Sequence, residues 1–144
     1  MASVNITQVY ASDLILWEPL ARNGREMITV NYAGGTLSFG HILFRVKSID
    51  PTAAWAPLVN GSDVLITNEY AVFLGDRYDF KDSLVVAATT ATPVLAIRRQ
   101  ARLKETLPKT IHVGGSLNQT QFNLLKEALK TQGIILEDVL TAIV

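Results

Sequence analysis

Two histidines and a group of three aspartates are the first candidates in this chain for metal chemistry. His41 and His112 lie far apart, and neither has a second histidine or cysteine close behind it. A zinc site needs three or four ligands in tetrahedral array, so the spacing does not predict one. Asp76, Asp79 and Asp82 recur at every third position, whereas a calcium loop needs oxygens at alternate positions and a glycine at the sixth. We therefore expect no metal and no cofactor.

Covalent and phosphate chemistry are no better supported by the motifs. Gly114-Gly115-Ser116 precedes a predicted helix, where backbone amides could cradle an anion. The segment lacks the Lys-Ser/Thr pair and the spacing of a phosphate loop, so a flexible strand-to-helix joint is favoured. The sequence contains no Gly-x-Ser-x-Gly elbow and no carboxylate pair that stands out. We expect no catalytic residue and no enzymatic activity.

A basic cluster offers binding rather than catalysis. Arg98, Arg102 and Lys104 occupy one face of a strand predicted over residues 94–104, and Arg99 is adjacent. One interpretation is a solvated edge that charge protects from strand-to-strand aggregation. The other is a contact with an acidic partner surface. Direct nucleic-acid binding is disfavoured because exposed aromatic residues are not interleaved with these cations.

The two tryptophans are candidate contact residues. Tryptophan is enriched at protein interfaces, where its large apolar surface leaves water. For Trp17, in an aperiodic segment, the sequence favours an interface. Trp55 lies within an apolar stretch of a loop over residues 48–63. Its two equal alternatives are a place in the core and a place in a contact with another subunit or with the capsid.

Composition bounds the remaining possibilities. The chain has 144 residues, of which 49% are hydrophobic and 18% charged, and its 13 basic and 13 acidic side chains cancel. We expect one domain. A neutral chain has no net positive charge to release counterions from nucleic acid, so this source of affinity is not predicted. There is no cysteine for a disulfide framework. The sequence predicts neither a signal peptide nor a membrane-spanning segment.

The N-terminal segment, residues 1–24, has no sustained period but carries many large apolar side chains. We interpret it as an arm that orders on a partner, with residues 25–144 forming a single β-rich domain. A first strand of the core, supported by the apolar run of residues 14–17, is the alternative. The arm's candidate contact residues are Val4, Ile6, Val9, Tyr10, Leu14, Leu16 and Trp17.

Apolar alternation predicts the strands of the domain. The expected strands cover residues 27–32, 41–47, 70–74, 84–88 and 94–104. In the second of them Ile42, Phe44 and Val46 should face the core, leaving a mixed opposite face. In the last, apolar side chains at alternate positions should face the core, opposite the basic cluster.

The helix near the C-terminus has the clearest signals. Asn118 and Gln121 have the spacing of a capping box, and Gly133 suits the left-handed position after a helix end. Between them, apolar side chains form one stripe that should cover a sheet. These side chains are Phe122, Leu125, Ala128 and Leu129.

Taken together, the order of these motifs resembles the head decoration proteins of tailed phages, of the lambda protein D type. The N-terminal part of the resemblance consists of Arg25-Glu26, Ile28-Thr29-Val30, Gly35-Thr36-Leu37, Gly40 and Ile42-Leu43. The C-terminal part consists of residues 94–99, then 117–121, the helix, and Gly133-Ile134-Ile135. It covers about residues 10–136. The chain departs from the family pattern over residues 62–75 and in its extension Glu137–Val144.

This resemblance implies a mainly β fold with one C-terminal α-helix, an α+β domain that is small and barrel-like or tulip-like, with an extended N-terminal arm. It implies a homotrimer on the outer capsid surface of the virion, made in the host cytoplasm. The major capsid protein is the implied partner, and the arm is expected to add to its strands. The alternative from another class is a small β-barrel ligand-binding module or a phage tail component.

Overall fold

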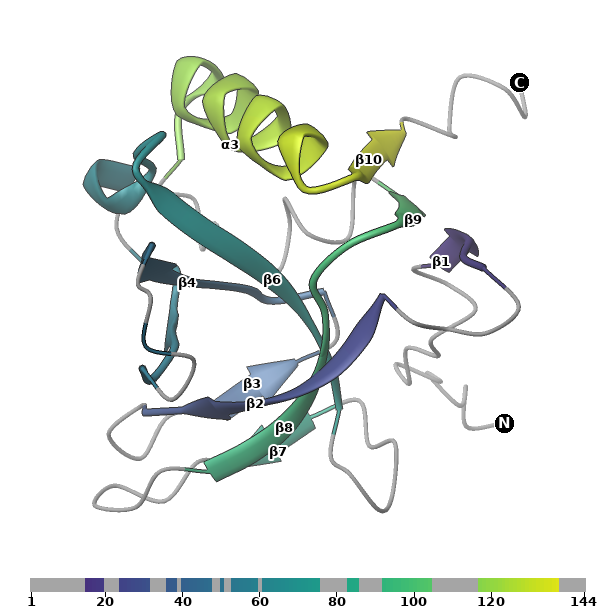
Figure 1. Cartoon of the computed structure of the whole chain (residues 1–144). Helices are drawn as coiled ribbons and strands as arrows, with labels where there is room; N and C mark the ends of the chain where they lie inside the picture. Colours follow the sequence, from purple (N-terminus) through teal and green to yellow (C-terminus); the bar gives the residue numbers. More distant parts are fainter. Residues whose placement is uncertain are drawn as a thin grey trace, which may run out of the picture.

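The computed structural model describes residues 15–19, 24–31, 36–38, 40–47, 50, 53–59, 61–75, 83–85, 92–104 and 117–137. Within them the chain is mainly β with a C-terminal helix, as predicted (Figure 1). The strands are β1 Ile15–Trp17, β2 Arg25–Val30, β3 Thr36–Ser38, β4 Ile42–Val46, β5 Ala56–Pro57, β6 Asn68–Gly75, β7 Ser83–Val85, β8 Thr92–Ile97, β9 Ala101–Lys104 and β10 Ile134–Glu137. A short 3-10 turn, Gly61–Asp63, and the helix α3, Gln119–Thr131, complete the described elements.

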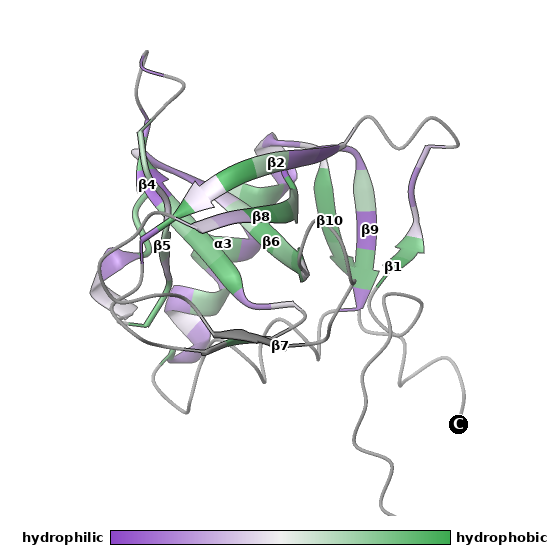
Figure 2. Ribbon diagram, turned by 90° about the horizontal axis from the view of Figure 1, so that it is seen from below, coloured by the Kyte–Doolittle hydropathy of each residue, from purple (hydrophilic) through white to green (hydrophobic). Residues whose placement is uncertain are grey.

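Three sheets organise these strands. The largest has five strands in the order β2-β8-β6-β4-β5, all antiparallel to their neighbours. A three-stranded sheet has the order β1-β9-β10, with β10 parallel to β9, and β3 pairs with β7. The chain passes directly from the first sheet to the second between β8 and β9. Figure 2 shows β10, β9 and β1 side by side, next to the five-stranded sheet.

A further backbone contact joins the two outer strands of the five-stranded sheet. Val30 in β2 forms a parallel bridge with Trp55, the residue before β5. The Trp55 amide donates to the Thr29 carbonyl and the Asn31 amide donates to the Trp55 carbonyl, each over 2.9 Å. The loop over residues 53–59 is therefore fixed against β2.

The five-stranded sheet is buried on both faces. In β6, Tyr70, Val72 and Leu74 point into one hydrophobic cluster, whereas Ala71 and Phe73 point into another. The first cluster continues through α3 and the inner side of the three-stranded sheet. The second contains Ile28, Val30, Leu37, Leu43, Trp55, Val94 and Ala96. This double burial explains the continuous apolar run that predicted a buried strand over residues 70–74.

Double burial also corrects the prediction for β4. Its mixed face was expected to stay open, but Leu43 is fully buried and Arg45 is only 8% exposed. Trp55 and Leu37 share the second cluster with Leu43 and cover that face. The strand end was also predicted to face the core, but Val46 is 68% exposed there.

The predicted helix is confirmed in its caps and its buried stripe. The Asn118 side chain accepts from the Gln121 amide over 2.8 Å, and the Gln121 side chain accepts from the Asn118 amide over 3.0 Å. Gly133 has a φ of 81°, which glycine adopts without strain. Phe122, Leu125, Ala128 and Leu129 are all buried, so the helix covers the first cluster.

The single long strand predicted over residues 94–104 is wrong, because the chain breaks at residues 98–100. Thr92–Ile97 and Ala101–Lys104 belong to different sheets, and Gln100 between them has a positive φ of 53°. The predicted inward set still reaches the first cluster, with Ile97, Ala101 and Leu103 buried and Leu95 packed beside them. The predicted strand over residues 84–88 is observed as β7, and its last three residues lie outside the described parts.

Candidate functional site

The break between β8 and β9 separates the cations that were predicted to share one face. Arg98 lies in the turn after β8, whereas Arg102 and Lys104 lie on β9 in the other sheet. Arg98 is partly covered, with 21% of its side chain exposed, and Arg102 is 52% exposed. Arg102 pairs with Glu137 on β10. The basic face is thus divided into one inner and one outer group.

Arg98 belongs to a charged network around Trp55. Its Nη1 atom donates to both carboxylate oxygens of Glu26, over 3.1 and 3.0 Å, and its Nη2 atom donates to Glu69 Oε2 over 3.3 Å. The other oxygen of Glu69 accepts from Arg45 Nε. Glu69 therefore links the two guanidinium groups, one to each of its oxygens.

Both guanidinium groups of this network also lie against the Trp55 ring. The central carbon of Arg45 is 4.5 Å and that of Arg98 is 5.1 Å from the ring centroid, within the range of a cation–π contact. Arg45 Nη1 donates to the Ala53 carbonyl over 2.7 Å. Trp55 itself is only 2% exposed. Between the alternatives left open by the sequence, Trp55 is therefore a core residue in this chain.

The turn that carries Arg98 is held from two sides. The Arg98 amide donates to the Gly24 carbonyl over 2.8 Å, and the Ala101 amide donates to the Gly133 carbonyl over 3.2 Å. A Cβ atom on Gly24 would lie 1.9 Å from the Arg99 carbonyl oxygen, so only glycine fits there. A Cβ on Gly133 would lie 3.2 Å from the Gln100 amide. We call residues 98–100 the clamped turn.

Gln132, at the end of α3, fixes the clamped turn to β6. Its side-chain amide donates to the Tyr70 carbonyl over 2.6 Å and to the Arg98 carbonyl over 3.0 Å, and its side-chain oxygen accepts from the Tyr70 amide over 2.9 Å. One side chain thereby satisfies backbone groups of β6 and of the clamped turn. Buried backbone groups without partners are costly, so this amide holds the helix end, β6 and the clamped turn together.

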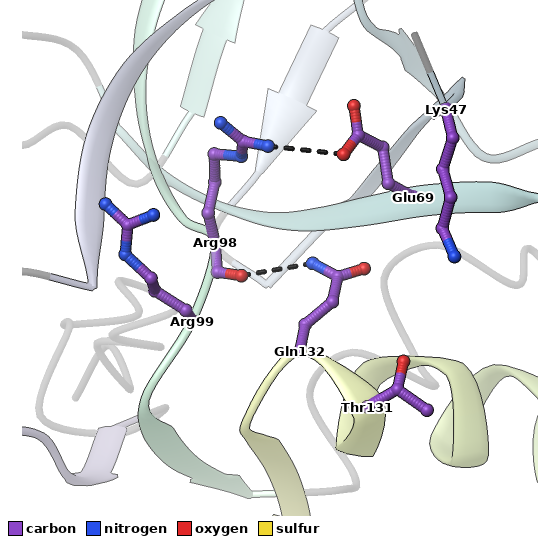
Figure 3. A pocket seen from close by; sticks show the side chains of 6 residues that line it. All are labelled: Lys47, Glu69, Arg98, Arg99, Thr131 and Gln132. Carbon is purple, nitrogen blue, oxygen red and sulfur yellow. Dashed lines mark hydrogen bonds and ion pairs between the residues drawn. The ribbon is translucent and has the colours of Figure 1, made fainter. Parts of the chain in front are cut away.

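A hollow of about 390 Å³ opens where these elements meet, and we call it the helix-end hollow (Figure 3). Lys47 and Arg99 lie on opposite sides of it, and the Arg98–Glu69 ion pair lies between them. Arg99 is 55% exposed and lies 4.0 Å from Glu26 Oε2. The residues that line the helix-end hollow are Lys47, Glu69, Arg98, Arg99, Thr131 and Gln132.

The outer face of the three-stranded sheet forms a second candidate surface. The strand register places Trp17 and Ile135 on either side of Arg102. Trp17 is 53% and Ile135 is 41% exposed, and with Ala101, Arg102 and Gly133 they line an apolar hollow of about 290 Å³. We call Trp17, Arg102 and Ile135 the outer row.

Part of the predicted arm contributes to this surface. Residues 15–17 form β1, whose Ile15 packs partly on the first cluster while Leu16 stays 37% exposed. Glu18 binds Arg25 through both carboxylate oxygens, which ties the segment after β1 to β2. The remaining predicted arm contacts lie outside the described residues; they are Val4, Ile6, Val9, Tyr10 and Leu14.

The residues considered for metal chemistry lie mostly outside the described parts, namely His112 and the three aspartates of residues 76–82, as does the Gly114-Gly115-Ser116 segment. His41 is buried, and burial lowers its pKa to about 4. Its Nε2 atom has no hydrogen-bond partner within the described part of the chain. No group of three potential metal ligands occurs among the described residues, and no described helix is long and apolar enough to cross a membrane.

Sequence reasoning found Arg98 and Arg99 but missed Glu26, Arg45, Glu69 and Gln132. Arg45 and Glu69 face each other directly across β4 and β6, a relation that appears only once the strand register is known. Glu26 and Arg98 are 72 residues apart. Comparison of the chain with protein-family models, with curated proteins and with solved structures gave no match.

Proposed function

We propose that this protein is a capsid decoration, or cementing, protein that binds the outer surface of an expanded phage head as a homotrimer. It would stabilise the shell against the pressure of the packaged DNA. Its partners are the major capsid protein and other copies of itself, and it acts on the virion after synthesis in the host cytoplasm. The motif order described above for residues 10–136 is the sequence support.

The observation that carries this proposal is the outer row. Trp17 and Ile135 are large apolar side chains that remain about half in water, beside an apolar hollow. Exposed apolar patches of this kind mark interaction sites. Residues 1–14, which the sequence predicts to be part of an apolar arm, immediately precede β1, the strand that carries Trp17. Many such contacts on one shell add up through multivalency.

The finer prediction of a barrel-like or tulip-like domain belongs to the same proposal. The bridge between Val30 and Trp55 supports it, because that bridge brings β2 toward β5, the opposite end of the five-stranded order. A barrel closes when its outer strands pair and leave no free edge. The second hydrophobic cluster, which contains Phe73 and Trp55, would then fill the barrel interior.

Sedimentation with expanded capsids tests the proposal. Full-length protein is mixed with capsids assembled from the cognate major capsid protein, and bound and free fractions are measured. We expect binding to be lost when residues 1–14 are removed, because strand addition supplies main-chain hydrogen bonds. The Trp17→Ser, Ile135→Ser double variant should bind about tenfold or more weakly. Failure of the full-length protein to sediment with the capsids would contradict the proposal.

A matched control distinguishes the outer row from general stickiness. Ile66 is 72% exposed and lies in the turn before β6, on the side of the molecule away from β1, β9 and β10 (Figure 1). Ile66→Ser makes the same chemical change as Ile135→Ser and should alter capsid binding by less than about twofold. Equal losses from the two variants would contradict a specific role for the outer row.

The second candidate, a small ligand-binding module, is favoured by the helix-end hollow, which Lys47, Arg98 and Arg99 help to line. Oligomeric state separates the two functions. Analytical ultracentrifugation should give the mass of a trimer for a decoration protein. A monomeric protein that does not bind capsids would favour the ligand-binding module.

A further inference from the structure

The apolar hollow beside the outer row, which we call the outer-row hollow, is lined by two large apolar side chains, one arginine and two very small residues. The strands that carry Trp17, Arg102 and Ile135 lie side by side (Figure 2). Ala101 and Gly133 complete the lining. Because Gly133 has no side chain, it leaves its part of the roughly 290 Å³ space unfilled.

The Arg102 guanidinium in this hollow has an ionic partner but keeps its faces available. It pairs with Glu137 on β10, and its side chain remains 52% exposed. Guanidinium N–H groups donate within the plane of the group, so an ion pair at the edge still allows a ring to stack on a face. No aromatic ring of the described residues lies over Arg102.

The charged network around Trp55 shows the same arrangement completed inside the molecule. Arg98 donates to Glu26 and Glu69, and its guanidinium carbon lies 5.1 Å from the Trp55 ring centroid. Arg45 is paired with Glu69, and its guanidinium carbon lies 4.5 Å from the same centroid. Both arginines therefore combine an ion pair to a glutamate with a contact to an aromatic ring. Arg102 has the first of these contacts and lacks the second.

We infer that the outer-row hollow receives an aromatic side chain of a partner protein, which stacks on the Arg102 guanidinium between Trp17 and Ile135. The inference rests on the proposed function, in which this partner is the major capsid protein. The incoming ring supplies to Arg102 the contact that Trp55 supplies to Arg98. It also contacts the Trp17 ring, and aromatic pairs attract each other beyond the area that they bury.

The charge and the size of the hollow favour this occupant over an acidic group or a free ligand. Arg102 is the one charged residue in the lining, and Glu137 balances it, so a carboxylate would find no surplus positive charge. The volume of about 290 Å³ lies just below the roughly 300–1,000 Å³ of ligand pockets. Such a space suits a single side chain that a larger molecule inserts. A leucine side chain would bury apolar area there but would gain no cation–π contact.

An NMR titration with short peptides tests the inference without capsids. Isotope-labelled full-length protein is titrated to millimolar concentrations with acetyl-Gly-Phe-Gly-amide, and separately with the peptides that carry leucine or glutamate at the centre. We expect the phenylalanine peptide to shift the signals of Trp17, Arg102 and Gly133. The leucine peptide should bind about threefold more weakly, because it lacks the cation–π contact. The glutamate peptide should leave these signals in place.

Three outcomes of this titration would overturn the inference. Leucine binding as tight as phenylalanine binding would remove the preference for an aromatic ring. Tighter binding of the glutamate peptide would show that the site recognises charge. No shift with the phenylalanine peptide, or shifts confined to residues away from the outer row, would remove the site itself.

The chain offers matched variants for the same titration. Arg99 and Arg102 are 55% and 52% exposed. Arg102→Gln should weaken binding of the phenylalanine peptide about threefold and leave the leucine peptide unaffected, whereas Arg99→Gln should change neither. A merely structural role of Arg102 would alter both peptides equally, and that result would overturn the stacking contact. Thermal melting verifies that each variant is folded.

Capsid sedimentation then separates this inference from the proposed function. Arg102→Gln should weaken capsid binding about threefold or more, and Arg99→Gln by less than about twofold. Capsid binding that is insensitive to Arg102→Gln, or that occurs without binding of the phenylalanine peptide, would overturn the aromatic site and leave the decoration function standing. Peptide binding without capsid binding would keep the site and overturn the decoration function.

Analytical ultracentrifugation decides between the capsid protein and a second copy of this chain as the source of the ring. The Trp17→Ser, Ile135→Ser double variant should keep the mass of the unmodified protein, because the outer row faces another partner. A loss of mass to the monomer would place the outer row between subunits and overturn the choice of the capsid protein.

Discussion

The five-stranded and three-stranded sheets share one stretch of chain, residues 92–104, yet they use its side chains differently. In β8, Val94 and Ala96 enter one hydrophobic cluster and Ile97 the other, so both faces of the strand are covered. In β9 only Ala101 and Leu103 are buried, and Arg102 points outward between Trp17 and Ile135. The first sheet is therefore covered on both faces, whereas the second leaves one face exposed.

The arginines of the two sheets show the same contrast. Arg98 has its charge balanced by Glu26 and Glu69 and lies over the Trp55 ring. Arg102 has one partner, Glu137, and half of its side chain is in water. Cations that look equivalent in the sequence thus differ in role: the first is part of the architecture, and the second is part of the surface.

The strongest test of this contrast is the loss of an aromatic ring from the doubly covered sheet. Phe73 is fully buried in the second cluster. Phe73→Ala should lower the free energy of unfolding by about 3–5 kcal/mol, because it removes apolar contacts and leaves a cavity. Urea denaturation followed by circular dichroism measures this. A loss below about 1 kcal/mol would mean that the five-stranded sheet is not the stable part of the molecule.

Acidic pH should also lower the free energy of unfolding, through His41 beside β4 of the five-stranded sheet. Burial lowers the pKa of His41 from about 6.5 to about 4, although a hydrogen bond with the Leu58 backbone acts in the other direction. The unfolded chain binds a proton below pH 6.5 while the folded protein stays neutral, so stability is full above pH 6.5 and falls as the pH drops toward 4. The loss should reach about 3 kcal/mol near pH 4.

Denaturation at several pH values checks this prediction, with His41→Leu as the control. The variant has no titrating group at this position, so its stability should change less between pH 6.5 and 5, above the range in which exposed carboxylates titrate. The same pH dependence in both proteins would assign the effect to other groups.

Removing the hydrogen bonds of the Gln132 side chain, which joins α3, β6 and the clamped turn, should have a smaller effect on stability. Gln132→Met preserves the approximate shape but removes the hydrogen bonds to Tyr70 and Arg98. We expect a loss of roughly 1–3 kcal/mol from the backbone groups left unpaired, together with faster hydrogen exchange at the Tyr70 amide. Gln119→Met, on the exposed start of α3, should change stability by less than about 0.5 kcal/mol. Equal losses would show that Gln132 does not act as a joint.

Local signals in the sequence were sufficient for the helix and for several strands. Asn118, Gln121 and Gly133 act within a few residues of where they stand, so their roles could be read directly. The buried strand β6 was also predictable, because its apolar run is uninterrupted. Elements of this kind depend on short-range patterns that the chain carries along its length.

The clamped turn could not be predicted for the opposite reason. Neither glycine nor proline lies within residues 98–100, yet Gln100 has a positive φ, in a turn that packs closely on Gly24 and Gly133, which are distant in sequence. The charge balance of Arg98 likewise depends on Glu26 and Glu69, which come from two other strands. The charged network around Trp55 therefore exists only through the tertiary arrangement, and strand periodicity alone placed Arg98 with the wrong neighbours.

The smallest loss of stability is expected from substitutions in the outer row. Trp17→Ser and Ile135→Ser should each lower the free energy of unfolding by less than about 1 kcal/mol, because both side chains are already about half in water. Thermal melting of the two variants beside Phe73→Ala provides the comparison. A loss above about 2 kcal/mol from either would show that this face supports the fold and would remove the distinction between the two sheets.

The position of α3 and β10 late in the chain has a consequence for synthesis. Tyr70, Val72 and Leu74 belong to the same hydrophobic cluster as Phe122, Leu125, Leu129 and Ile134. While the ribosome still holds the C-terminal part, this face of β6 is not covered by α3. The Tyr70 backbone then has no hydrogen bonds with the Gln132 side chain. We therefore expect the first cluster to be completed only once the helix has left the ribosome, and the apolar side chains of β6 to be prone to misassociation until then.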